Sequence, residues 1–289
     1  MRLRHESIRA CVLLMVSATI TVHAEEGHIG PAQNPMGHFK ALYSENNTMF
    51  GLGPSDAVVN ILNIKPVWPE PVENWNLVNR LILPVIWMEG QDIDLPPELL
   101  ERVGQRRVEV GASDLSLGTE DVFGLGDITY QVFVARHRPG KFVWGIGPTF
   151  VFPTHTDELL GVDQWSGGVG GMLLTAPGRW VISAVAQNVW SFIGDDDEGE
   201  INQFWLEYIL NYRLGNGWFI ASSPTITANW KATGGDRWTI PLGGGIGRAI
   251  KSRDYPATFK LEAFWNAEKP QFAADWTLQA TLNLLFPRM

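Results

Sequence analysis

Serine, histidine and aspartate, the residue types that build a hydrolytic site, lie close together at one place in the sequence. His155, Asp157 and Asp163 precede Ser166. A hydrolase needs a nucleophile, a base and a group that orients the base, all within reach of one another. Ser and Asp are also common in loops, so the cluster has a second interpretation as ordinary loop residues. We therefore predict no catalytic residue and retain hydrolysis as an alternative.

Three further patterns resemble ligand-binding motifs but lack essential parts. GGGIGR (243–248) has neither the Lys and Ser/Thr of a phosphate-binding loop nor a helix after it. DDDEGE (195–200) clusters carboxylates, but it lacks the positional pattern of a calcium loop. No two of four histidines are as close in sequence as a metal-binding pair would be: His28, His38, His137 and His155. We therefore predict no metal and no cofactor, and we expect no nucleic-acid partner.

The elements that must position these residues are strands. In DWTLQATLNLLFPRM (275–289), apolar residues from Leu278 to Phe286 alternate with polar residues from Thr277 to Asn283. A period of two describes a strand with one apolar and one polar face. The segments 201–213 and 257–266 alternate in the same way. The polar faces of these three segments supply nine candidates for a polar interior: Gln203, Glu207, Asn211, Lys260, Glu262, Thr277, Gln279, Thr281 and Asn283.

The connections between the alternating segments, which also include 125–136 and 217–229, alternate between short and long. Short connections stand at 68–75, 138–141, 176–179, 214–217 and 252–256. Long connections stand at 89–124, 153–164, 193–200, 230–237 and 267–274. This asymmetry is typical of transmembrane barrels, which have tight periplasmic turns and longer outer loops. Tryptophans near the segment ends fit the aromatic belts of such barrels. With a further strand at 42–50, we predict an all-β fold: a transmembrane antiparallel up-and-down β-barrel of about 12 strands.

The N-terminus carries the features of an export signal. Residues 1–10 are basic, residues 11–20 are apolar, and Ala24 ends a cleavage-like site. We predict a signal peptide at 1–24, a periplasmic segment at 25–41 and an outer-membrane barrel at 42–289. Cys11, the single cysteine, lies in the signal peptide, so the mature chain is expected to have no disulfide.

Several stretches resemble the outer-membrane proteins grouped as the phenol-degradation meta-pathway family, which is often mislabelled neuromedin U. The stretches that carry the resemblance include NNTMFGLGP (46–54), NILNIKPVWP (60–69), WNLVNRLILPV (75–85), GLGD (124–127), RWTIPLGGGIGR (237–248) and DWTLQATLNLLFP (275–287). The resemblance implies a barrel in the outer membrane of a Gram-negative bacterium that acts as a transport channel.

The expected function is therefore a passive channel for the uptake of small hydrophobic or aromatic molecules. Its expected partners are membrane lipid, lipopolysaccharide and a small-molecule solute. Two alternatives stay open: a lipid-acting outer-membrane hydrolase, and a plugged structural barrel without transport.

Overall fold

The computed structural model describes residues 40–90, 120–136, 141–194, 200–250, 252 and 255–286. Several predictions lie outside these residues: the signal peptide at 1–24, most of the 25–41 segment, and most of the loops 89–124 and 195–200. His28, His38 and His137 lie outside them as well. Among the described residues, no helix has the length and apolar character needed to cross a membrane.

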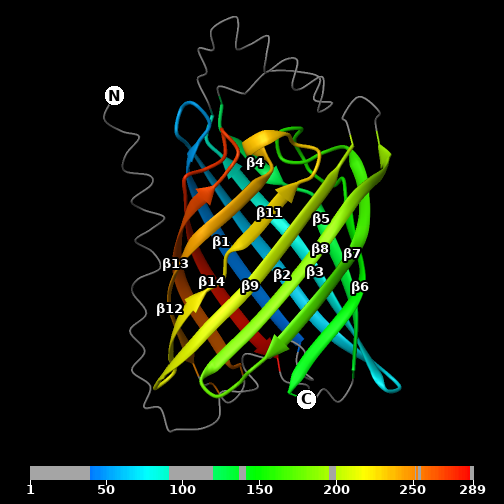
Figure 1. Ribbon diagram of the computed structural model, residues 1–289, viewed down its shortest axis with the longest axis vertical. Helices are drawn as coiled ribbons and strands as arrows, with labels where there is room; N and C mark the ends of the chain where they lie inside the picture. The colour runs from blue at the N-terminus through cyan, green and yellow to red at the C-terminus, as the bar shows by residue number, and fades with distance from the viewer. Residues whose placement is uncertain are drawn as a thin grey trace, which may run out of the picture.

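The described residues form one closed, antiparallel sheet (Figure 1). In chain order its strands are β1 (Lys40–Leu52), β2 (Ala57–Val72), β3 (Trp75–Met88), β4 (Val122–Leu125), β5 (Ile128–Arg136), β6 (Phe142–Phe152), β7 (Gln164–Thr175), β8 (Trp180–Gly194), β9 (Asn202–Gly215), β10 (Trp218–Ser222), β11 (Thr225–Asn229), β12 (Trp238–Ile250), β13 (Ala257–Glu268) and β14 (Trp276–Phe286). Because β4 and β5 both pair with β3, and β10 and β11 both pair with β9 and β12, each of these two pairs makes one crossing. The described wall is a barrel of 12 crossings, which confirms the predicted fold.

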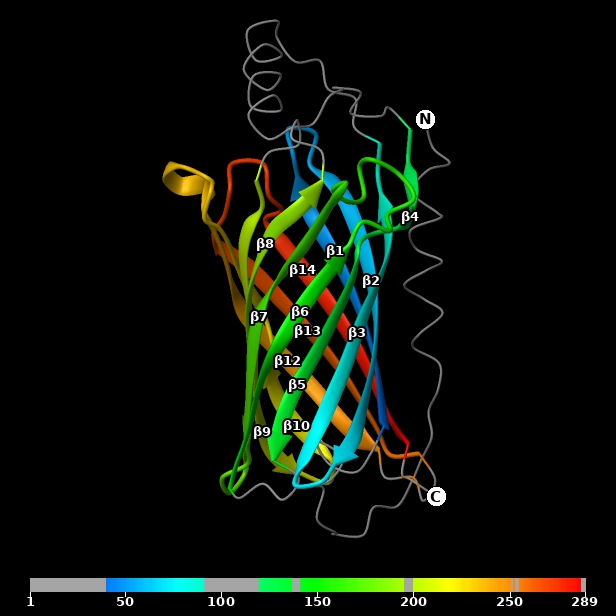
Figure 2. The ribbon, with the colours of Figure 1, turned by 90° about the vertical axis from the view of Figure 1, so that its right-hand side faces the viewer.

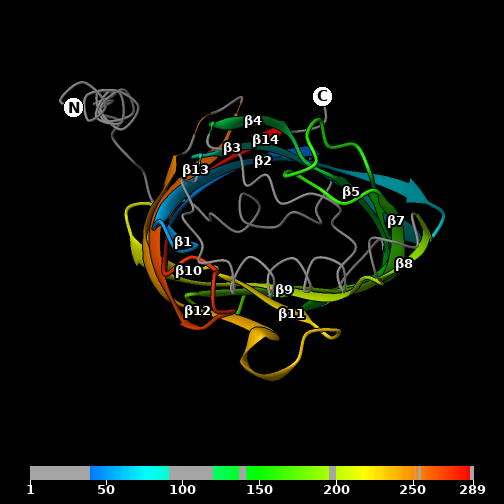
Figure 3. The same ribbon diagram turned by 90° about the horizontal axis from the view of Figure 1, so that it is seen from above.

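The first and last strands close the barrel. β1 pairs with β14 from Lys40↔Phe286 to Phe50↔Trp276 and with β2 on its other edge. β1 begins at Lys40, two residues before the expected start at 42. Viewed from above, the strands make an oval ring without a free edge (Figure 3). A closed ring satisfies the backbone groups that an open edge would leave unpaired in lipid.

The connections fall into two sets at opposite ends of the barrel (Figure 2). We call these the turn end, with 176–179 and 215–217, and the loop end, with 153–163 and 230–237. The turn predicted at 68–75 is shorter than expected, because β2 runs to Val72 and β3 begins at Trp75. Glu73, with a φ of 53°, adopts the left-handed conformation that a two-residue hairpin turn requires.

The outer face of the barrel is apolar and its ends carry tryptophan. On β13, Phe259, Leu261 and Trp265 are exposed, whereas Lys260 and Glu262 are buried inside. Nine tryptophans are exposed near strand ends: Trp75, Trp144, Trp165, Trp180, Trp190, Trp218, Trp230, Trp265 and Trp276. An apolar band flanked by aromatic belts is the surface that a bilayer requires.

One stretch of the wall departs from regular pairing. β10 pairs with β12 up to Ala221↔Gly245, and pairing resumes only at Thr227↔Thr239 on β11. We call this stretch, where 222–226 and 240–244 do not pair with each other along the backbone, the wall gap. Each side still pairs with its other neighbour, β9 or β13, and the Ser222 hydroxyl donates to the Gly243 carbonyl across the gap at 2.8 Å. Pro224 and Pro241 lie in it, and proline has no N–H to donate to a neighbouring strand.

Candidate functional site

A cavity of about 620 Å³ occupies the loop-end half of the barrel interior. Its upper wall is largely apolar, with side chains from strands all around the ring: Ile61, Ile82, Val151, Val189, Trp205 and Phe264. Polar residues, among them Asn47, Asn63 and Thr129, stand between them. A cavity with apolar walls and a few convergent polar groups is the usual form of a small-molecule site.

Charged side chains cross the bottom of this cavity. Lys65 Nζ lies 2.9 Å from Glu45 Oε2 and 3.9 Å from Glu207 Oε2. The guanidinium of Arg80 donates to the same Glu207 oxygen at 2.5 Å. Arg80 on β3 and Glu207 on β9 belong to strands that are not neighbours, so this ion pair connects two separate parts of the wall.

Amide side chains extend the network. Arg80 also donates to Gln131 Oε1 at 3.3 Å, and Gln131 donates to Gln187. We call Glu45, Lys65, Arg80, Gln131, Gln187 and Glu207 the floor network. It holds two cations and two carboxylates, so its formal charge is balanced. Ion pairs at such buried positions need this mutual compensation, because an unpaired charge away from water is costly.

An apolar cluster lies inside the barrel between the floor network and the turn end, on β1 to β3, β5 to β8 and β14. Its ten buried residues are Ala41, Val67, Val78, Phe133, Ala135, Val143, Met172, Leu174, Val181 and Leu285. None of them lines the cavity. Val67 and Val78 lie two positions from Lys65 and Arg80 toward the turn end, so the cluster begins directly below the network. On these strands the cavity therefore ends at packed apolar side chains.

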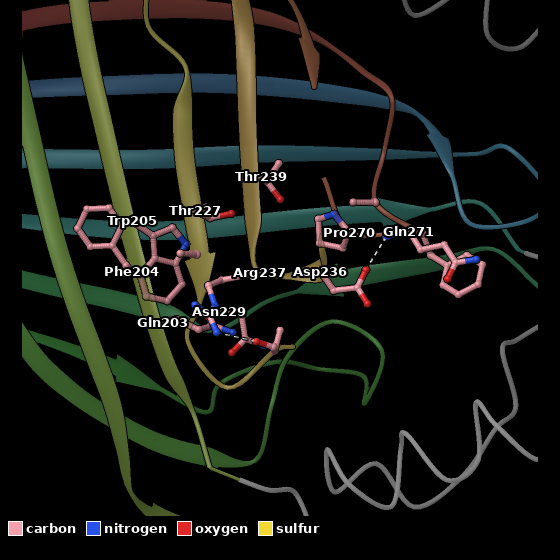
Figure 4. Close-up of a pocket in the computed structure, with 14 residues that line it drawn as sticks. Gln203, Phe204, Trp205, Thr227, Asn229, Asp236, Arg237, Thr239, Pro270 and Gln271 are labelled. Atoms are coloured by element: carbon pink, nitrogen blue, oxygen red, sulfur yellow. Dashed lines mark hydrogen bonds between the residues drawn. The ribbon is translucent and has the colours of Figure 1, made fainter. Parts of the chain in front are cut away.

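A second pocket, of about 370 Å³, lies at the loop end above β9, β11 and β12 (Figure 4). Phe204, Trp205 and Phe272 give it an aromatic lining. The backbone N–H of Gln271 donates to Asp236 at 3.0 Å and joins the two loops over it (Figure 4). Both the pocket and the cavity are lined by five residues: Gln203, Trp205, Thr227, Thr239 and Ala273. The two spaces therefore adjoin.

A salt bridge outside the membrane-spanning strands holds one of these loops. Lys231 on the 230–237 loop pairs with the exposed Glu200 just before β9. The hydrogen bond from Lys231, and next its charge, lower the pKa of the Glu200 carboxyl. The bond connects the two long connections on either side of β9 to β11.

The nine predicted interior residues fall into two groups. Gln203, Glu207, Thr277 and Gln279 line the cavity. The other five lie away from it, either in the interior polar clusters or nearer the turn end: Asn211, Lys260, Glu262, Thr281 and Asn283. Lys260 Nζ lies 2.6 Å from Glu262 Oε2, which also accepts from Ser223 at 2.6 Å. Asn283 donates to Thr258 at 3.1 Å.

The sequence reasoning missed most of the floor network. Glu45, Lys65, Arg80, Gln131 and Gln187 were not among the nine candidates, although Glu207 was. Each is a polar residue inside a β-strand that crosses the barrel. A search for charged residues in otherwise apolar strands would have found the charged members.

The Ser/His/Asp cluster does not assemble a hydrolytic site. His155 Nδ1 lies 2.8 Å from Asp127, and His155 Nε2 lies 3.2 Å from Asp163. Both ring nitrogens are therefore occupied by carboxylates, and the buried Ser166 hydroxyl has no hydrogen-bond partner among the described residues. Asp157 accepts from the backbone N–H of Leu159 at 3.0 Å and stabilises a turn. Among the described residues, no group of three potential ligands is placed to hold a metal ion.

The closed ring, the apolar outer band and the polar interior define an outer-membrane β-barrel. Residues 43–224 match the family described as "Putative MetA-pathway of phenol degradation", and the chain belongs to this family. A comparison with curated proteins finds no match.

Three solved structures are similar to this chain, and the first of them shares its fold. The COG4313 outer membrane channel from Pseudomonas putida F1 superposes with a TM-score of 0.59 at 13% identity, covering 91% of this chain and 99% of that one. The CymD monoaromatic hydrocarbon channel gives a TM-score of 0.44 at 10% identity, covering 92% and 94%. The calcium-bound outer membrane phospholipase dimer from Salmonella typhi gives 0.42 at 10% identity, covering 85% and 90%. At these identities the likeness concerns the fold alone.

Proposed function

We propose that this barrel is a passive outer-membrane channel for the uptake of small hydrophobic or aromatic molecules. The observation that carries the proposal is the cavity of about 620 Å³, with its apolar upper wall and its polar floor, inside a lipid-embedded barrel. The aromatic-lined pocket at the loop end adjoins this cavity and supplies a first binding place for an apolar solute. The named channels among the similar structures agree with this proposal but do not carry it.

One observation favours a second candidate function, a plugged structural barrel. The floor network and the apolar cluster lie inside the barrel between the cavity and the turn end. Passage of a solute through the whole barrel would require these side chains to move. A barrel that never opens would bind a solute in its cavity without transporting it.

Uptake by whole cells separates the two candidates. The rate at which an aromatic solute enters is measured in Gram-negative cells with and without the protein, and the ionic conductance of the purified barrel is measured in planar bilayers. The channel proposal expects faster uptake together with low conductance, because the floor network and the apolar cluster lie in the path of hydrated ions. Equal uptake with and without the folded protein would refute the channel and leave the plugged barrel.

A pair of tryptophan substitutions shows whether uptake uses the cavity. Val185→Trp places a large side chain in the cavity, since Val185 lines it. Val169→Trp adds the same bulk on the lipid-facing surface, where Val169 is exposed. The first change should reduce uptake several-fold and the second should leave it unchanged.

A further inference from the structure

Glu207 holds a central place in the floor network. Its Oε2 atom lies 2.5 Å from the Arg80 guanidinium and 3.9 Å from the Lys65 ammonium. The other carboxylate of the network, Glu45, contacts Lys65 but has no ion pair with Arg80 among the described residues. Glu207 is therefore the ion-pair partner of Arg80 and the second acidic contact of Lys65.

All four charged groups face the cavity, since Glu45, Lys65, Arg80 and Glu207 line it. Their side chains are largely shielded from solvent, with exposed fractions between 8% and 21%. Electrostatic interactions are stronger in such surroundings than in water. A solute that enters the cavity meets a floor whose positive and negative charges already compensate one another.

A charged solute gains no free partner at this floor, yet it loses its hydration on entry. An uncharged solute with one polar group loses less, because hydrogen-bonding amides such as Gln131 and Gln187 line the same cavity. Transfer of an unpaired carboxylate away from water costs far more than transfer of an amide. The balance of charge at the floor thus favours uncharged solutes over carboxylates of the same shape.

We propose that Glu207 is the specificity-determining residue of the cavity: by neutralising Arg80 and Lys65, it makes the site accept uncharged aromatic solutes and reject aromatic carboxylates. The proposal rests on the proposed function in that the cavity must bind solute. Without the Glu207 charge, the floor would hold two cations and one carboxylate, and Arg80 would be free to receive a carboxylate through charge-assisted hydrogen bonds.

Three probes of nearly the same shape test the inference: uncharged benzamide, anionic benzoate and cationic benzamidine. Binding to the detergent-solubilised barrel is measured by calorimetry at neutral pH. The wild-type protein should bind benzamide much more tightly than either ion. Glu207→Gln keeps the size of the side chain and one acceptor oxygen, and it should shift the benzoate-to-benzamide affinity ratio by about tenfold or more toward benzoate.

Glu200→Gln is the matched control. It removes the same charge from an exposed carboxylate at the loop end, which does not line the cavity. Its affinity ratio should equal that of the wild type. A shift as large as that of Glu207→Gln would show that overall charge, and not the floor, decides, and would overturn the inference.

Arg80→Gln removes a positive charge from the floor network instead of a negative one. It also provides the test if Glu207→Gln fails to fold. It leaves Glu207 in excess at the floor, so benzamidine should bind and benzoate should not. Two results would overturn the role of Glu207 but leave the proposed function standing. One is an unchanged benzoate-to-benzamide affinity ratio in the folded variants, and the other is wild-type binding of benzoate as tight as that of benzamide. Absence of binding of every probe to the folded wild type would also refute the proposed function, which distinguishes the two failures.

Discussion

Whether a residue of this barrel faces lipid or the interior depends on its place in the alternation along the strand, which we call its parity. On β14, Leu278 and Leu282 are exposed on the outer face, whereas Gln279 and Thr281 are buried inside. An outward side chain must suit hydrocarbon, and an inward one must find a partner within the barrel. Adjacent residues therefore meet opposite requirements.

Arginine substitutions on β14 test this assignment. Leu282→Arg places a charge in lipid and should cost about 2–4 kcal/mol if it lies near the bilayer midplane. Gln279→Arg should be tolerated, because Gln279 lines the cavity and is paired in register with Glu262, whose Oε1 atom has no hydrogen-bond partner among the described residues. The folded fraction of each variant after refolding into lipid is the measurement. Equal losses in both would contradict the parity assignment.

Parity predicts which face a residue occupies, but not which residue it meets across the interior. The placement of Glu207 on the polar face of its strand follows from alternation within 203–212. Its contact with Arg80 joins positions 127 apart in the sequence, and it depends on how the closed ring brings β3 and β9 together. The position of the apolar cluster below the floor network likewise depends on packing between many strands. No local sequence pattern contains this information.

At the scale of elements, the 153–163 connection is fastened to an interruption in the wall. β4 ends at Leu125 and β5 begins at Ile128, and Asp127 stands between them. Its carboxylate accepts backbone N–H groups of Thr154, His155 and Val162 at 2.9–3.2 Å, in addition to its contact with the His155 ring. The sequence suggested one continuous strand at 125–136 and gave no sign that an aspartate would interrupt it to hold a loop.

Asp127→Ala should release this loop while leaving the barrel folded. The variant loses all four contacts of the carboxylate, and hydrogen bonds to charged groups are among the stronger ones in proteins. We expect protease cleavage within 153–163 to become about tenfold faster or more, as measured on the barrel in detergent. Asp163→Ala, which removes one contact of a largely exposed side chain, is the control and should have a much smaller effect. Unchanged cleavage in Asp127→Ala would show that the loop is held by other means.

The prediction of one continuous strand at 217–229 was wrong in one respect. The structure divides it into β10 and β11 at Ser223–Pro224. The alternation is kept on both sides of the division, so the pattern alone indicated a single strand. Pro224 removes one donor, but whether a proline interrupts a strand depends on the facing strand, which here carries Pro241 and glycines.

At the scale of the whole molecule, closure of the ring and the two kinds of connection were predictable together. Alternating segments give strands, regularly sorted connections give an up-and-down order, and the need to pair both edges in lipid gives closure. The weak candidate at 42–50 is confirmed as the strand that completes the ring, because β14 pairs with it along its length.

The orientation of the barrel gives a prediction at this scale. Epitope tags inserted in 230–237 should be reachable by antibody on intact cells, whereas tags in 214–217 should become reachable only after the outer membrane is permeabilised. The reason is the preference of outer-membrane barrels for long outer loops and short periplasmic turns. Heat-induced mobility shifts on gels verify that both tagged proteins fold. The opposite labelling pattern would reverse the orientation.

The wall gap has a mechanical consequence. In a closed ring, each strand is held to both neighbours by hydrogen bonds, so the ring resists a change in the shape of its cross-section nearly equally everywhere. Between 222–226 and 240–244 that resistance is reduced, because the paired register is interrupted there. When the surrounding lipid compresses or stretches the oval outline, the deformation will concentrate at this place, and the rest of the ring will keep its curvature.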